Sequence, residues 1–253
     1  MIIKKDKLIV EIFNNRDEMG KKAAADIAEC IKNLLSQKEE INMIFAAAPS
    51  QNDMLYHLCK RTDVDWEKVN AFHMDEYIGL KSDAPQCFSN YLKTKIFDLK
   101  PFKSVNLINA GASDSIKECE RYGELLKKYP VDIVCMGIGE NGHIAFNDPH
   151  VANFCDNEIV KCVKLDNICR MQQVNDGCFS SLNEVPEYAV TLTVPALMAA
   201  KYNFCVVPAT TKANAVKNTL EGEINEMCPA TILRNKDNAI MYCDLESSAL
   251  LNL

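Results

Sequence analysis

The sequence predicts an α/β fold, with one doubly wound, mostly parallel, Rossmann-like sheet and helices on both of its faces. The main observation is an alternation of short, β-rich apolar runs with longer helical patterns along the 253 residues. In addition, 48% of the residues are hydrophobic and 25% are charged, which is ordinary for a globular chain of this size. No repeat or Pro/Gly-rich linker divides the chain, so residues 1–253 are interpreted as a single domain.

The strands are predicted where Val, Ile and Phe form near-continuous apolar runs, as in parallel strands buried on both faces. The eight predicted strand segments are 7–13, 41–48, 68–74, 104–110, 131–138, 189–194, 203–209 and 239–244.

Helices are predicted between these runs. Met19, Ala23, Ile27 and Ile31 recur at helical spacing after Asn15, which is a good N-cap residue. Segments 115–129 and 211–224 carry similar patterns. The stretch 149–185 has no clear period and is expected to be a loop insertion or lid.

The composition of the chain argues against several kinds of binding partner. The net charge of −7 and the absence of a Lys/Arg block argue against nucleic acid and against an anionic membrane surface. No apolar run is long enough for a membrane span, and charge interrupts the N-terminal apolar stretch, so a cytoplasmic protein is expected. The twelve cysteines form no CxxC pair and the histidines have no ligand spacing with them, so no metal site is predicted.

Three polar loops follow predicted strands, at the sheet edge where α/β proteins bind ligands. They are "AAAPSQND" at 46–53, "MDEYIGL" at 74–80 and "GIGENGHIAFNDPH" at 137–150. Adjacent side chains at a strand end point to opposite sides, so only one of Asp75 and Glu76 is expected to face a ligand. The alternative is that both are solvated turn residues.

The third loop is rich in glycine. Gly137, Gly139 and Gly142 have the spacing of a dinucleotide fingerprint, but "FNDP" interrupts the helix that should follow, which disfavours NAD. His143 is either a structural histidine or a general acid and base, with Asp148 five residues further on.

Four segments together resemble the glucosamine-6-phosphate deaminase/isomerase family: "FHMDEYIGL", "GIGENGHIAFNDP", "VPEYAVTLTVPAL" and "TTKANAVKNTLEGEINEMCPATIL". The resemblance covers nearly the whole chain and is weakest at 149–184. It implies conversion of a hexosamine 6-phosphate, with glucosamine 6-phosphate favoured, to a ketohexose 6-phosphate and ammonia. The implied steps are ring opening, 1,2-proton transfer and deamination, without a metal or organic cofactor.

The resemblance also implies catalytic roles. Asp75 would move the proton between C2 and C1, and His143 would open the ring with help from Asp148. Asn141 stands where the family commonly has aspartate, so its amide can orient the imidazole but supplies no charge, which predicts a weaker base. Asp148 stands where glutamate is usual, and its reach is shorter by roughly 1.5 Å.

The phosphate loop departs from the family pattern "PTGxTP". Ser50 and Gln51 can still donate to phosphate beside a helix N-terminus. Lys212 matches the family lysine that reaches the phosphate, and Arg170 is assigned by analogy. The predicted substrate-binding residues are Ser50, Gln51, Glu76, Gly142, Arg170 and Lys212.

Two alternatives remain open. One is a 6-phosphogluconolactonase-like hydrolase, although "MDEYIGL" and "FNDP" favour deamination. The other is a sugar-phosphate-binding sensor that has lost catalysis. The expected partner in each case is a small-molecule sugar phosphate, and the resemblance also allows a homo-oligomer.

Overall fold

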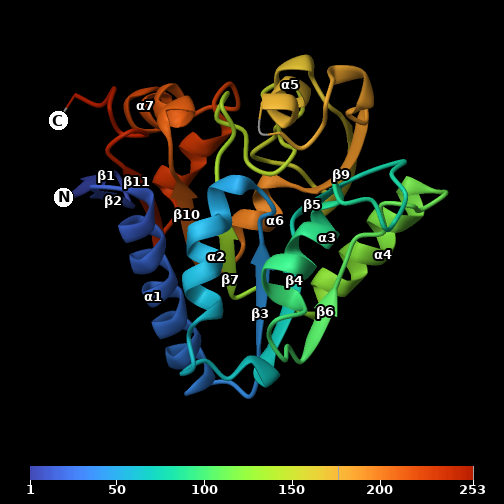
Figure 1. Cartoon of the computed structure of the whole chain (residues 1–253), viewed down its shortest axis with the longest axis horizontal. Coiled ribbons are helices and arrows are strands. Elements are labelled where there is room, and N and C mark those ends of the chain that lie inside the picture. Colours follow the sequence, from blue (N-terminus) through green and yellow to red (C-terminus); the bar gives the residue numbers. More distant parts are fainter. Residues whose placement is uncertain (176, 253) are drawn as a thin grey trace.

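An eight-stranded sheet forms the centre of the computed structural model, which describes residues 1–175 and 177–252 (Figure 1). Its strand order is β1-β2-β11-β10-β7-β3-β4-β6, and every neighbouring pair is parallel except the β1–β2 hairpin. The mostly parallel α/β sheet predicted from the sequence is confirmed. The strands are β1 (Ile2–Lys5), β2 (Leu8–Phe13), β3 (Ile41–Phe45), β4 (Val69–His73), β6 (Ser104–Asn106), β7 (Ile133–Met136), β10 (Tyr202–Val207) and β11 (Ala239–Asp244).

Helices cover both faces of this sheet, each over its own apolar cluster. In β3, Met43 and Phe45 belong to one cluster, whereas Ile44 belongs to the other. Burial on both faces explains why the strand is apolar throughout. The first face carries α1 (Arg16–Leu35), α2 (Asn52–Cys59) and α3 (Phe88–Leu92), and the second carries α4 (Ser115–Lys128), α6 (Val194–Met198) and α7 (Ala213–Glu221).

Helix α1 begins as its sequence predicts. The Asn15 side chain accepts a hydrogen bond from the Glu18 backbone N–H at 2.9 Å. Acidic residues occupy the first turn and Lys32 the last, which suits the helix dipole. The predicted apolar stripe, including Met19 and Ile27, is buried.

A second, three-stranded antiparallel sheet follows the carboxyl end of β4, with the order β5-β9-β8. Its strands are β5 (Asp75–Tyr77), β8 (Val160–Lys164) and β9 (Tyr188–Leu192). The predicted strand at 189–194 therefore lies here rather than in the main sheet, and β5 occupies a predicted loop.

The segment 149–185, expected to be a loop insertion, contains both β8 and a helix, α5 (Asn167–Asn175). The loop assignment is wrong for these residues. In β8 the buried positions are Val160 and Val163, three residues apart, so the alternation typical of a strand is absent.

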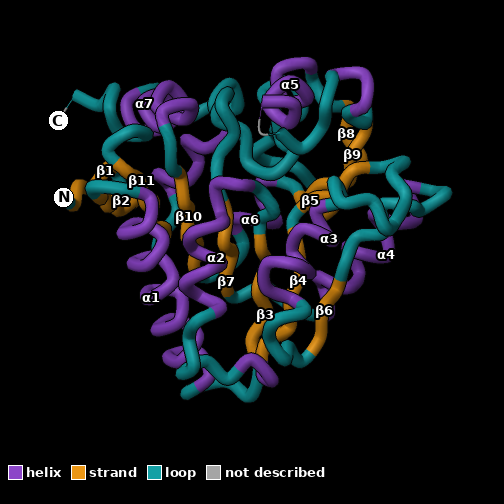
Figure 2. Tube along the Cα trace, in the orientation of Figure 1, coloured by secondary structure: helices purple, strands orange, loops and turns teal. Residues whose placement is uncertain are grey.

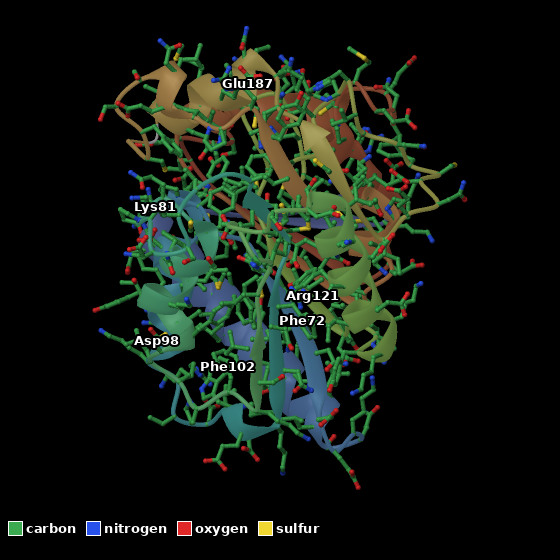
Figure 3. All side chains as sticks on the ribbon, turned by 90° about the vertical axis from the view of Figure 1, so that its right-hand side faces the viewer. Phe72, Lys81, Asp98, Phe102, Arg121 and Glu187 are labelled. Atoms are coloured by element: carbon green, nitrogen blue, oxygen red, sulfur yellow. The ribbon has the colours of Figure 1, made fainter. Side chains whose placement is uncertain are left out.

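Loops and short helices gather over one end of the main sheet (Figure 2). The exposed side chains of Lys81, Asp98 and Glu187 lie on the outside of the molecule, whereas the buried Phe72 lies along the sheet (Figure 3). None of the described helices combines the length and the apolar character that crossing a bilayer requires.

Helices α1 and α2 pack closely at Gly20, where a Cβ atom would lie 2.6 Å from Asp53 Cβ and 2.8 Å from the Met54 nitrogen. Overpacking costs about 1–3 kcal/mol, whereas alanine gains only about 0.5–1 kcal/mol over glycine in a helix. We therefore expect Gly20→Ala to lower the free energy of unfolding by about 1–2 kcal/mol in urea titration.

Gly123 in α4 is the matched control, because a Cβ there would meet only Val160 Cγ2, at an ordinary 4.0 Å. Gly123→Ala should raise the free energy of unfolding by about 0.5–1 kcal/mol. Equal effects of the two substitutions would contradict the packing argument.

Candidate active site

Strand β9 brings two of the predicted site loops together. Its Thr191 pairs opposite Asp75 of β5. On the same strand, Thr191 Oγ1 accepts a hydrogen bond from the Phe146 N–H at 3.1 Å, and the Leu192 carbonyl accepts one from Asn147 Nδ2 at 2.8 Å. One strand thus holds both the acidic segment and the histidine loop.

These loops line a cavity at the carboxyl ends of the main strands. Five predicted site residues contribute to its wall: Ser50, Gln51, Asp75, His143 and Lys212. Four polar residues outside the predicted set also line it: Arg16, Gln172, Gln173 and Thr211.

Asp75 lies at the start of β5 and is only 7% exposed. Burial raises the pKa of its carboxyl well above the ordinary value, and the neighbouring Glu76 raises it further. A carboxyl group in this position can take up a proton, hold it and return it, as a proton-transfer residue must.

Glu76 points away from the cavity, so its assignment to substrate binding is wrong. It is fully buried, and its carboxylate accepts hydrogen bonds from the backbone N–H groups of Phe88 at 2.9 Å and Ser89 at 2.8 Å. Burial raises its pKa, although these N–H groups offset part of the effect. Glu76 caps the N-terminus of α3, and its opposite orientation to Asp75 follows from strand geometry.

His143 is oriented by two oxygens. Its Nδ1 lies 2.8 Å from Asn141 Oδ1 and 2.9 Å from Asp148 Oδ1. Because both atoms are acceptors toward the ring, we place a proton on Nδ1, which leaves the Nε2 lone pair of the neutral ring available. The imidazole occupies the space beside Gly139, where any Cβ atom would overlap the ring.

Asp148 supplies the charge that Asn141 lacks. Burial raises the pKa of this carboxyl, but attraction to His143 and hydrogen bonds from His143 and Asn141 outweigh it, and the net pKa is lowered. The charge behind His143 therefore comes from Asp148, the acidic partner that the sequence analysis named, and not from position 141. The short side chain of Asp148 reaches the imidazole directly, and Asn141 Nδ2 donates to the same carboxylate at 2.9 Å.

Asn141 and Asp148 do not themselves line the cavity, so they act on His143 from behind. The Cys169 thiol of α5 lies close to His143 and Asp148. One potential metal-ligand atom from each of the three residues lies within 4.8 Å of the other two. Cys169 lies more than 20 residues from Asp148 in the sequence, so the grouping has no short ligand spacing that a sequence pattern could indicate.

Two cationic residues lie on the cavity wall. Lys212 is buried and precedes α7. Arg16, at the first turn of α1, is held by Asp53 through Nε–Oδ2 at 2.7 Å. Arg16 follows the end of β2. The criterion of polar residues directly after a strand, which identified the three site loops, therefore also applies to Arg16.

The loop that replaces the family phosphate turn keeps polar groups at the cavity. Gln51 is fully buried, and its Nε2 donates to Ser50 Oγ at 3.1 Å and to the Val206 carbonyl at 3.2 Å. Since Ser50 Oγ accepts from Gln51, its own hydroxyl proton is available to donate to a ligand.

Arg170 and Gly142, which were predicted to bind substrate, do not line the cavity in this structure. The Arg170 guanidinium donates to the carbonyls of Leu182 at 2.8 Å and Val185 at 2.9 Å, so it anchors α5 instead. Gly142 has a φ of 81° and packs against Cys228, which makes it a turn residue that supports the histidine loop.

Known proteins resemble the chain over nearly its whole length. The profile of the family described as glucosamine-6-phosphate isomerases/6-phosphogluconolactonase matches residues 14–242. A glucosamine-6-phosphate deaminase from Streptococcus suis (strain 05ZYH33) is 31% identical, over 96% of this chain and 99% of the relative. One from Listeria monocytogenes (serotype 4a, strain HCC23) is 34% identical, over 92% and 95%.

Solved structures agree with this. A monomeric glucosamine-6-phosphate deaminase superposes with a TM-score of 0.86 at 27% identity, over 96% of this chain and 99% of that one. A 6-phosphogluconolactonase from Thermotoga maritima shares the fold, with a TM-score of 0.77 at 18% identity, over 94% and 100%. The chain belongs to the glucosamine-6-phosphate isomerase/6-phosphogluconolactonase family.

Proposed function

We propose that this protein converts glucosamine 6-phosphate, or a closely related hexosamine 6-phosphate, to a ketohexose 6-phosphate and ammonia. The observation that carries the proposal is that Asp75 and His143 line one cavity together with the cations Arg16 and Lys212. The deaminases of Streptococcus suis and Listeria monocytogenes support an amino sugar as the substrate.

Ring opening is assigned to His143. Its Nε2 accepts the proton of the anomeric hydroxyl and returns one to the ring oxygen, so the step needs no net proton. The imidazolium that forms in between is stabilised by the carboxylate of Asp148 at Nδ1. Asn141 holds that carboxylate in place.

The carbon chemistry is assigned to Asp75. It removes the proton from C2 of the open-chain sugar while the aldehyde oxygen takes a proton from the substrate's own ammonium group, which gives an enolamine. Delivery of the C2 proton to C1 then leaves an iminium at C2 and a hydroxyl at C1. Water then adds to C2 and ammonia leaves, giving the ketone. A buried carboxyl with a raised pKa suits this task because it can hold the proton between the two carbons.

The sugar phosphate is assigned to the cationic side of the cavity. Lys212 and Arg16 supply charge, and the Ser50 hydroxyl supplies a hydrogen bond. Two assays distinguish the proposal from the lactonase and sensor alternatives. A lactonase hydrolyses 6-phosphogluconolactone, whereas a sensor shows a thermal shift with glucosamine 6-phosphate without releasing ammonia.

The first test incubates the protein with glucosamine 6-phosphate and measures ammonia and fructose 6-phosphate. Asp75→Asn should lower kcat by about 10²–10⁴-fold, since a positioned acid–base group contributes about that much. Exchange of the C2 proton with deuterated solvent should fall with it.

Asp83→Asn, which changes an exposed carboxylate outside the cavity wall, is the control and should leave both rates unchanged. If no hexosamine 6-phosphate epimer releases ammonia, the proposed substrate class is wrong. If C2 exchange survives in Asp75→Asn, the role of Asp75 is wrong.

The second test concerns Arg16, which family likeness did not point to. Arg16→Gln should raise KM for glucosamine 6-phosphate by about tenfold, because a charged hydrogen bond contributes about 1.5–3 kcal/mol and partial exposure reduces it. The Ki of inorganic phosphate should rise in parallel, with kcat nearly constant.

Arg61→Gln is a matched control, because Arg61 is similarly exposed and similarly paired, with Asp63, but does not line the cavity. It should leave both constants unchanged. An unchanged phosphate Ki in Arg16→Gln would show that Arg16 does not contact the phosphate.

A further inference from the structure

We propose that His143, Asp148 and Cys169 form a binding site for a thiophilic divalent cation such as Zn²⁺, and that the bound ion inhibits the enzyme by occupying the imidazole Nδ1. The inhibition rests on the proposed function, whereas the binding does not. Of the three residues only His143 lines the cavity, so the ion would lie behind the cavity wall.

The donor set matches Zn²⁺. A thiolate, an imidazole nitrogen and a carboxylate oxygen are its usual protein ligands, and three of them plus water complete a tetrahedron. Zinc–ligand bonds of about 2.0–2.3 Å place neighbouring ligand atoms roughly 3.4–3.6 Å apart. The three donors already lie within 4.8 Å of one another, so side-chain shifts of about an ångström suffice.

Asp148 provides a second, independent observation. Its Oδ1 is occupied by His143 and Asn141. Its Oδ2 is buried and receives no N–H or O–H donor from the described residues, and the whole residue is 0% exposed. The other group in hydrogen-bond contact with this carboxylate is the Cys169 thiol, a weak donor. A weak thiol donor satisfies a buried carboxylate poorly, and a cation bound between the carboxylate and the sulfur would replace that contact with two metal–ligand bonds.

The backbone holds the three donors in position. Cys169 lies in the first turn of α5, where its N–H donates to Asp166 Oδ1 at 2.6 Å. His143 and Asp148 belong to the loop that β9 holds through Phe146 and Asn147. The thiolate selects Zn²⁺ over Mg²⁺ and Ca²⁺, which prefer oxygen ligands alone.

Binding would reverse the protonation of the imidazole. An ion on Nδ1 uses the lone pair of that nitrogen, so the ring proton moves to Nε2, and the thiol releases one proton to solvent. His143 would then present an N–H donor in place of the Nε2 lone pair. It could no longer accept the anomeric proton, and ring opening would stop.

The test titrates ZnCl₂ into the amino-sugar-phosphate assay and reverses the effect with a chelator. Wild-type protein should be inhibited. Because loss of a supporting outer-shell group alone weakens metal binding about 10–100-fold, Cys169→Ala should raise the half-inhibitory concentration by at least about tenfold relative to its own metal-free rate. Cys162→Ala, which removes an exposed thiol of β8, should behave as wild type.

Co²⁺ binding gives a readout that needs no turnover. Wild type and Cys162→Ala should show thiolate-to-cobalt charge-transfer absorption and tetrahedral d–d bands, which should be lost in His143→Gln and in both Cys169→Ala and Cys169→Ser. The two Cys169 variants guard against the misfolding of either one.

The outcomes are distinct. Cobalt bands in a protein that never releases ammonia would sink the proposed function and leave the metal site standing. Turnover without zinc inhibition, inhibition unchanged in Cys169→Ala, or cobalt bands that persist without Cys169 would each overturn the metal proposal.

Discussion

The geometry of the candidate site depends on β9, which pairs with β5 on one side and accepts hydrogen bonds from the histidine loop through Thr191 and Leu192. Asp75 belongs to the small sheet, whereas the histidine loop leaves the main sheet after β7. The hydrogen bonds of β9 connect Asp75 in the small sheet with the histidine loop. A buried N–H left without its acceptor costs about 1–3 kcal/mol, so the histidine loop is held firmly relative to Asp75.

Two buried carboxyl groups acquire opposite properties from their surroundings. Asp75 has its pKa raised because burial and a like charge disfavour ionisation. Asp148 is also buried, but its hydrogen bonds and the neighbouring imidazole keep its pKa low. Because their environments shift the two pKa values in opposite directions, the two carboxyl groups suit different roles. Asp75 can carry a proton, and Asp148 remains a fixed negative charge behind His143. The same buried charge beside a thiol underlies the proposed cation site with Cys169.

Local patterns predicted the parts of the molecule that depend on local physics. The buried strands of the main sheet and the Asn15 cap follow from apolar runs and from capping chemistry within a few residues. Strand β8 and helix α5 were missed because their form is set by packing against partners distant in the chain. Glu76 and Arg170 were assigned to the ligand because a charged side chain reads the same in sequence whether it meets substrate or buried backbone. Arg16 lies far from the histidine loop in the sequence, and the only local signal for it is its position just after β2.

A crystal structure of the Asp75→Asn variant with glucosamine 6-phosphate tests the central claim most directly. The account predicts one sugar in the cavity, with C1 and C2 within about 3–3.5 Å of the side chain at position 75 and the ring oxygen within about 3 Å of His143 Nε2. The phosphate should contact Lys212. A sugar bound with its C2 against a different side chain, or with position 75 and His143 contacting two separate ligands, would contradict the account.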